Sequence, residues 1–179
     1  MELIEVLRTK KGAILTRCFD LVAGTYPRET ASFLKNEADS FSNPVGRAIR
    51  EALEGLLREL IEAGSGGDFR QALEGLIRIR AVQTPLASEA LAFVGFLRKV
   101  IRDEVEAEAA GTGAGDRLRQ AYLKLEDRIE EAMLVACDLY VESRQKIDEV
   151  RIKEVKAREE RLSRLLRAVQ GRSGEKDEG

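Results

Sequence analysis

One arginine occupies a position where the helical pattern calls for an apolar residue. The residues that share this side of the helix, at the spacing i, i+3, i+4 and i+7, are Leu73, Leu76, Ile77 and Arg80. An unpaired guanidinium is costly to bury, so a carboxylate or exposed carbonyl groups must meet it. Two interpretations stay open: a structural arginine that ties helices together, which we favour, and a contact for an anion or signal ligand. Gln83, three residues further on, could belong to the same polar spot.

Two phenylalanines on the next helical segment could form the apolar part of a ligand site. Phe93 and Phe96 belong to a segment that is apolar nearly all round, so we expect it to be a central helix covered by others. A pocket beside it would hold an apolar tail, with the arginine near the polar end of an acid ligand. The candidate ligand-binding residues are therefore Arg80, Gln83, Phe93 and Phe96.

The residue types in this sequence do not favour catalysis or metal binding. The chain has no histidine, which excludes a His-ligated haem, a His-containing zinc site and a Ser-His or Cys-His pair. Carboxylate pairs such as Glu130 with Glu131, or Glu104 with Glu108, lack the Glu-x-x-His partners of bundle di-iron sites. We expect them to be solvated, and we expect Cys18 to be a core thiol. The sequence therefore predicts no enzyme, no metal site and no cofactor.

Composition and charge narrow the class of partners. The 179 residues are 44% hydrophobic and 35% charged, with 30 basic and 32 acidic residues and a formal charge of −2. This balance does not favour nucleic-acid binding. No apolar run reaches the roughly 18 residues of a membrane span, and the first residues lack a signal-peptide pattern. Two cysteines far apart in the sequence favour reduced thiols, so we expect a cytoplasmic protein without membrane contact.

Helical periodicity dominates the chain, and turn residues divide it into segments. Gly24 to Pro27 ends a first helix from about Glu2, and a short helix should follow at residues 28–35. Asn43 and Pro44 form a helix start, and Asp68 caps a further helix that runs to about Gln83. Thr84 and Pro85 precede the fifth helix. The order predicts an all-α bundle of about five helices in residues 1–110.

A single uninterrupted segment follows the bundle. From Asp116 to about Gln170 there is no proline or glycine, so a helix of about 80 Å is expected there. Its first half is amphipathic and should pack on the bundle, whereas its second half is densely charged with a thin, coiled-coil-like seam. Residues 171–179 should be a disordered tail. The candidate contact residues for a second helix are Ile147, Val155, Leu162, Leu165 and Leu166.

Four motifs occur in an order that resembles a known family. They read Tyr-Pro-Arg-Glu-Thr-Ala-Ser-Phe-Leu at residues 26–34, Phe-Ser-Asn-Pro-Val-Gly at 41–46, Ile-Arg-Ile-Arg-Ala-Val-Gln at 77–83 and Ser-Glu-Ala-Leu-Ala-Phe-Val at 88–94. Between Leu3 and Glu104 the chain is similar to the N-terminal domain of the RsbT co-antagonist protein RsbRD. The resemblance implies a globin-like sensor domain without haem, which belongs to the stressosome and passes a signal through a C-terminal helix to a STAS domain. No STAS domain follows here, so direct binding of a switch kinase through one is not expected.

The residues and the resemblance lead to two functional hypotheses. The first is a non-enzymatic signal-sensing or scaffold module of a stress-response type, which docks or transmits through its long helix. It predicts a homodimer and a regulatory protein partner. The alternative is a small-molecule binding protein that holds an apolar acid between its core helices.

Overall fold

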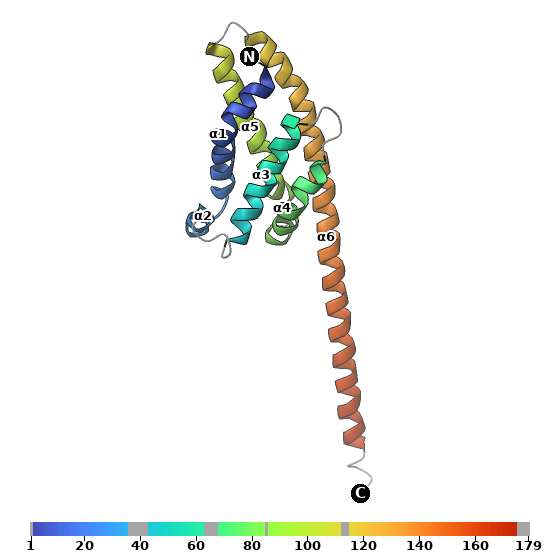
Figure 1. The fold of residues 1–179 in the computed structure, drawn as a ribbon. Helices are drawn as coiled ribbons and strands as arrows, with labels where there is room; N and C mark the ends of the chain where they lie inside the picture. The colour runs from blue at the N-terminus through green and yellow to red at the C-terminus, as the bar shows by residue number, and fades with distance from the viewer. Residues whose placement is uncertain (1, 36–42, 63–67, 85, 112–114, 175–179) are drawn as a thin grey trace. The chain divides into compact units, whose positions relative to one another are not determined.

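Helices make up the whole of the regular structure that can be described. A computed structural model describes residues 2–35, 43–62, 68–84, 86–111 and 115–174, with side chains as far as residue 167. Within these ranges there are helices and no strand (Figure 1). The helices are α1 (Leu3–Ala23), α2 (Arg28–Lys35), α3 (Pro44–Glu62), α4 (Phe69–Gln83), α5 (Ala87–Gly111) and α6 (Gly115–Gly174). The predicted all-α class with a long C-terminal helix is confirmed.

The helix boundaries follow the local signals closely. The second helix has the predicted bounds, and α3 starts at the proline that was expected to open it. Asp68 caps α4, because its Oδ1 accepts a hydrogen bond from the backbone N–H of Gln71 at 3.1 Å. Helix α6 ends at Gly174, four residues beyond the predicted end at Gln170. Residues 175–179 of the expected tail lie outside the described residues.

The chain consists of two compact units, Met1–Val141 and Glu142–Gly179. In the first unit α1 packs against α5 and α3, and α4 packs against α3 and α5, while the short α2 contacts α1 and α3 (Figure 1). Helix α5, expected to be a central helix covered by others, packs on other helices along one side only. Its apolar side is buried, but Arg98, Lys99 and Arg102 are exposed, because three long cations give this helix a solvent face.

The first part of α6 belongs to the core of the first unit. Its buried side chains are Leu118, Tyr122, Leu125, Ile129, Ala132, Ala136, Leu139 and Tyr140. Arg128 attaches this part of α6 to the end of α3, where it donates hydrogen bonds to the carbonyls of Glu59 at 2.9 Å and Leu60 at 3.2 Å. Those carbonyls lie in the last turn of α3, where backbone carbonyls have no N–H donor within the helix. The guanidinium also lies 5.5 Å from the centroid of the Phe69 ring of α4.

A buried asparagine fixes the junction between α2 and α3. Asn43 is 3% exposed, and its Oδ1 accepts a hydrogen bond from the backbone N–H of Gly46 at 2.9 Å. Its Nδ2 donates to the carbonyls of Phe33 at 3.2 Å and Leu34 at 3.0 Å. One side chain therefore caps the start of α3 and the end of α2. A Cβ at residue 46 would lie 2.5 Å from the amide atoms of that side chain, so the position requires glycine.

We predict that Gly46→Ala destabilises the protein by about 1–3 kcal/mol, because the added methyl must displace a buried, hydrogen-bonded amide. Gly75→Ala is the matched control. A Cβ at Gly75, in the interior of α4, meets nothing within 4 Å. That control should gain about 0.5–1 kcal/mol from helix propensity. Urea unfolding followed by circular dichroism measures both values, and equal stabilities for the two variants would contradict the capping role of Asn43.

Candidate functional site

Arg80 connects the last turn of α4 to the first turn of α5. The residue is 7% exposed. Its Nη2 donates a hydrogen bond to the backbone carbonyl of Glu89 at 2.5 Å. The guanidinium also lies over the ring of Tyr26, 5.0 Å from the ring centroid. A carbonyl and an aromatic face therefore meet the buried charge, and both hold the guanidinium in one orientation.

Thr84, which follows α4 directly, joins three elements through its hydroxyl and its carbonyl. Its Oγ1 donates to Oε2 of Glu89 at 2.7 Å and accepts from the backbone N–H of Leu86 at 3.2 Å. Its carbonyl accepts a buried hydrogen bond from the hydroxyl of Tyr140 in α6, at 3.2 Å. The connection between α4 and α5 is thus bonded directly to the part of α6 that lies in the first unit.

A cleft of about 660 Å³ opens beside these residues. Its walls come from the turn between α1 and α2, from α2 itself, from the end of α4 and from the start of α5. The lining residues are Thr25, Tyr26, Thr30, Arg80, Gln83, Thr84, Ser88, Glu89 and Ala92. Most of them carry a hydroxyl, amide or charged group, although carbon atoms make up the larger part of the exposed lining. The cleft therefore offers several hydrogen-bonding groups to a small ligand.

The structure brings two of the four candidate ligand residues into this cleft. Arg80 and Gln83 both line it, and Oε1 of Gln83 accepts a hydrogen bond from the Tyr26 hydroxyl at 2.8 Å. Phe93 and Phe96 are not among the lining residues. Phe93 is buried and Phe96 is half-buried, which suits core packing.

Sequence reasoning missed several residues of the site. Tyr26 and Thr84 each precede a proline, which is typical of a residue at a helix boundary and gives no sign of a binding role. Glu89 is one of many exposed glutamates, and nothing in its spacing marks it. Tyr140 lies on the apolar face of α6, and nothing in the sequence marks its hydroxyl as a donor. Only the fold shows that these side chains meet.

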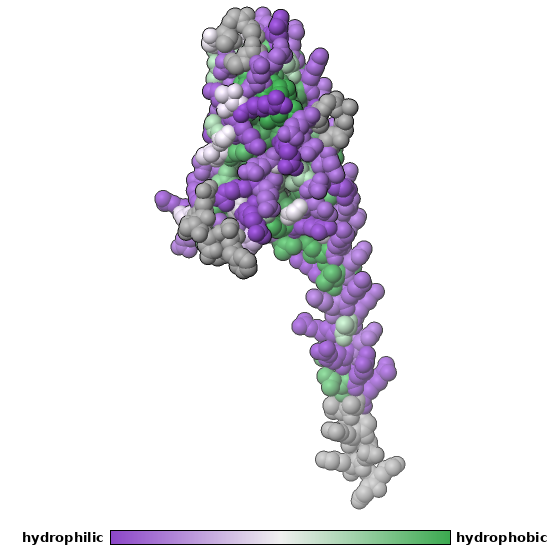
Figure 2. Space-filling view, viewed as in Figure 1, coloured by the Kyte–Doolittle hydropathy of each residue, from purple (hydrophilic) through white to green (hydrophobic). Residues whose placement is uncertain are grey.

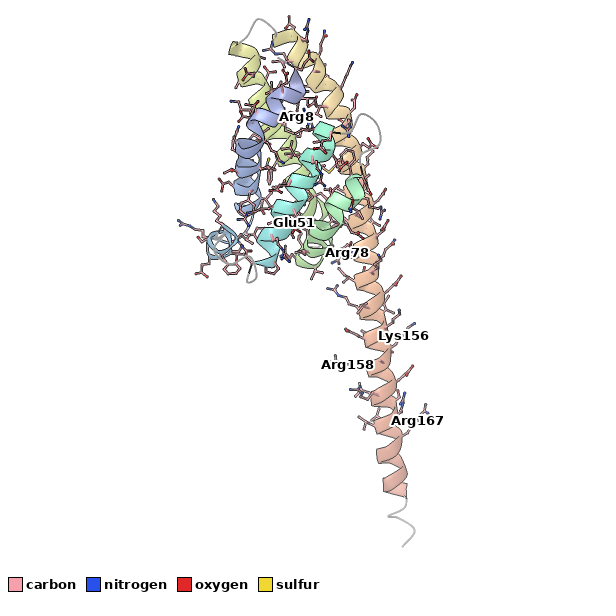
Figure 3. The ribbon with its side chains drawn as sticks, viewed as in Figure 1. Arg8, Glu51, Arg78, Lys156, Arg158 and Arg167 are labelled. Atoms are coloured by element: carbon pink, nitrogen blue, oxygen red, sulfur yellow. The ribbon has the colours of Figure 1, made fainter. Side chains whose placement is uncertain are left out.

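The candidate contact residues of the second unit are largely exposed. The exposed fraction is 56% for Val155, 54% for Leu162, 58% for Leu165 and 62% for Leu166, whereas Ile147 is half-buried. Figure 2 shows this part of α6 as a hydrophilic surface with separate apolar spots. Charged side chains such as Lys156, Arg158 and Arg167 project from the helix between them (Figure 3).

The carboxylates considered for metal binding either contact cationic side chains or face solvent. Glu104 accepts a hydrogen bond from Nη1 of Arg17 at 2.6 Å, and Nζ of Lys10 lies 3.8 Å away. Glu130 and Glu131 are exposed. In the part of the chain that the structure describes, no three His, Cys, Asp or Glu side chains gather where they could hold a metal ion. No described helix combines the length and the apolar character that crossing a membrane requires.

The two cysteines differ in environment. Cys18 on α1 is fully buried and Cys137 on α6 is half-buried, and both are free thiols. Burial raises the pKa of the Cys18 thiol to about 12, because the thiolate would lose its hydration; the nearby Arg17 opposes this only in part. Since the thiolate is the reactive form, Cys18 is a structural thiol.

We predict that iodoacetamide modifies Cys137 in the native protein and leaves Cys18 intact. Because the pKa of Cys18 is raised from 9.0 to about 12, its thiol stays protonated at the pH of the experiment. The burial of Cys18 also keeps the reagent away from its sulfur. Peptide mass spectrometry after native alkylation, compared with alkylation in denaturant, provides the measurement. Modification of Cys18 as fast as Cys137 would contradict the buried environment.

Comparison with known proteins gives one family. The family model described as RsbT co-antagonist protein rsbRD N-terminal domain matches residues 12–155. No curated protein and no solved structure matches the chain. The matched span covers well over half of the chain and includes α6 as far as Val155, which is further than the four sequence motifs reach. The chain therefore belongs to the RsbT co-antagonist protein rsbRD N-terminal domain family.

Proposed function

We propose that this chain is a non-enzymatic signal-sensing or scaffold module of a stress-response system, which docks through α6 to a second copy of itself and to a regulatory partner. Family membership supports the regulatory role. The observation that carries the docking role is the exposure of large apolar side chains in the second unit. A lone helix cannot bury its own apolar residues, so a partner helix must cover them.

The exposed apolar residues of the second unit follow a heptad pattern. Ile152, Val155, Leu162 and Leu166 are separated by steps of three, seven and four residues, and each is more than half exposed. With about 100° between successive residues, these four fall on one stripe, which we name the apolar seam. Glu159 occupies the remaining core position of the pattern, where a polar residue can specify register at a cost in stability.

The seam refines the set of contact residues taken from the sequence. Val155, Leu162 and Leu166 belong to it. Leu165 and Ile147 lie about 100° away around the helix, so we assign them to its flanks. Ion pairs such as Arg164 to Glu160, at 3.4 Å, run along the helix and add only a few tenths of a kcal/mol each. Apolar contact is therefore the main source of stability for a coiled coil here.

The second candidate function is binding of a small molecule, and the cleft at Arg80 supports it. The guanidinium lies in a cleft large enough for a metabolite. The apolar acid first expected is less suitable than a hydrophilic ligand, because neither Phe93 nor Phe96 lines the cleft. Native mass spectrometry of freshly purified protein would detect such a ligand as an added mass that is lost on denaturation.

We predict that the full chain is a dimer in solution and that a chain ending at Ser143 is a monomer. Leu162→Glu should also give a monomer, because it places a charge in the apolar seam. Val150→Glu is the matched control: Val150 is 54% exposed, as Leu162 is, but lies on the opposite side of the helix. Multi-angle light scattering gives the masses. A shortened chain with the same oligomeric state as the full chain would contradict the proposal.

A further inference from the structure

The guanidinium of Arg80 has hydrogen-bonding capacity that the protein does not use. It carries five N–H groups, and within the described residues one nitrogen, Nη2, donates to a protein acceptor, the carbonyl of Glu89. No buried side-chain nitrogen or oxygen of the described residues lacks a partner, so the other guanidinium nitrogens are accessible from the cleft. A ligand carboxylate could accept two of these N–H groups side by side.

A carboxylate with a spare oxygen lies in the same cleft. Oε2 of Glu89 accepts the hydroxyl of Thr84, whereas Oε1 accepts no hydrogen bond from the described residues. Further hydrogen-bond donors and acceptors line the cleft near Glu89. Ser88 lies with it in the first turn of α5, where backbone N–H groups have no intrahelical acceptor. The Thr25 hydroxyl donates to the carbonyl of Val22 at 2.7 Å, which leaves its oxygen free to accept.

A guanidinium and a carboxylate in one cleft favour one class of ligand. Glu89 would repel a phosphate dianion, since like charges in one site disfavour each other. A long apolar tail would meet no large aliphatic side chain, because Ala92 is the one purely aliphatic side chain among the lining residues described. A molecule with one carboxylate and one ammonium group would satisfy both Arg80 and Glu89.

We propose that this cleft binds a small zwitterion of the amino-acid type, with its carboxylate on Arg80 and its ammonium group on Oε1 of Glu89. This inference rests on the proposed sensing function and supplies its ligand class. The hydroxyl groups of Thr30 and Ser88 line the rest of the cleft and provide hydrogen bonds to a polar side chain of the ligand.

The same residues connect the ligand to α6. An ammonium group on Glu89 changes the charge next to the hydrogen bond between Glu89 and Thr84, and the carbonyl of Thr84 accepts the hydroxyl of Tyr140. Tyr140 lies one residue before the end of the first unit, on the helix that continues into the second. Occupation of the cleft therefore alters the hydrogen bonding of the α6 turn around Tyr140.

Isothermal titration calorimetry of the full chain tests the ligand. The probes are the common L-amino acids, each alone at millimolar concentration, with acetate and ethylamine as half-ligands. At least one amino acid should bind and neither half-ligand should match it. Arg80→Gln and Glu89→Gln should each weaken binding about tenfold or more, through loss of a charge-assisted hydrogen bond. Arg78→Gln, an exposed arginine of the same helix paired with Glu74, is the control and should bind as the natural chain does.

The titration either supports or overturns binding of a zwitterion. No binding by any amino acid, or equal binding of acetate, overturns the zwitterion. Where Arg80→Gln does not fold, Glu89→Gln decides, because Glu89 is exposed and its loss does not open the core. Light scattering on the same samples reports the dimer separately, so failure of the ligand is distinguished from failure of the docking function.

Hydrogen exchange tests the link to α6. The bound amino acid should change the exchange of residues 134–141 in the natural chain, and Tyr140→Phe should bind the ligand yet lose that change. An unchanged exchange pattern in the natural chain, with ligand bound, overturns the link. Exchange that still responds in Tyr140→Phe overturns the role of its hydroxyl.

Discussion

Burial of apolar surface along α6 is the constraint on which the rest of the structure depends. Up to Tyr140 the helix places a regular series of apolar side chains in the core of the first unit. In the second unit the large apolar residues from Val150 to Leu166 are more than half exposed. One helix thus contains a segment that its own unit stabilises and a segment whose apolar surface calls for a partner. The proposed docking function follows from this difference.

A set of hydrogen bonds between α4, α5 and α6 gives the first unit a way to respond to a signal. Arg80, Thr84 and Glu89 form a connected set of hydrogen bonds at the junction of α4 and α5. Tyr140 joins the same set from α6. Arg80 and Thr84 are buried, and hydrogen bonds at buried groups respond to a new charge because the effective dielectric around them is lower than in water. A ligand in the cleft therefore acts on groups that already bond to the helix proposed to transmit the signal.

Local chemistry made most of the fold predictable from the sequence. Asn43 with Pro44, Asp68, and Thr84 with Pro85 each mark a helix boundary by a mechanism that does not depend on tertiary contacts. The candidate site was less predictable. Arg80 could be singled out because a cation on an apolar helix face needs a partner, but its partners could not. Tyr26 and Tyr140 reach the site from segments far apart in the sequence, and only packing brings them together.

Disulfide trapping of the apolar seam is the most direct test of the docking account. In a Cys137→Ala background, Leu162→Cys places a thiol in the proposed seam, and Val150→Cys places an equally exposed thiol on the opposite face. Mild oxidation should link two chains rapidly through residue 162 and slowly through residue 150, because core positions of a parallel, in-register helix pair bring equivalent residues close. Equal linkage at both positions, or none at residue 162, would contradict the account.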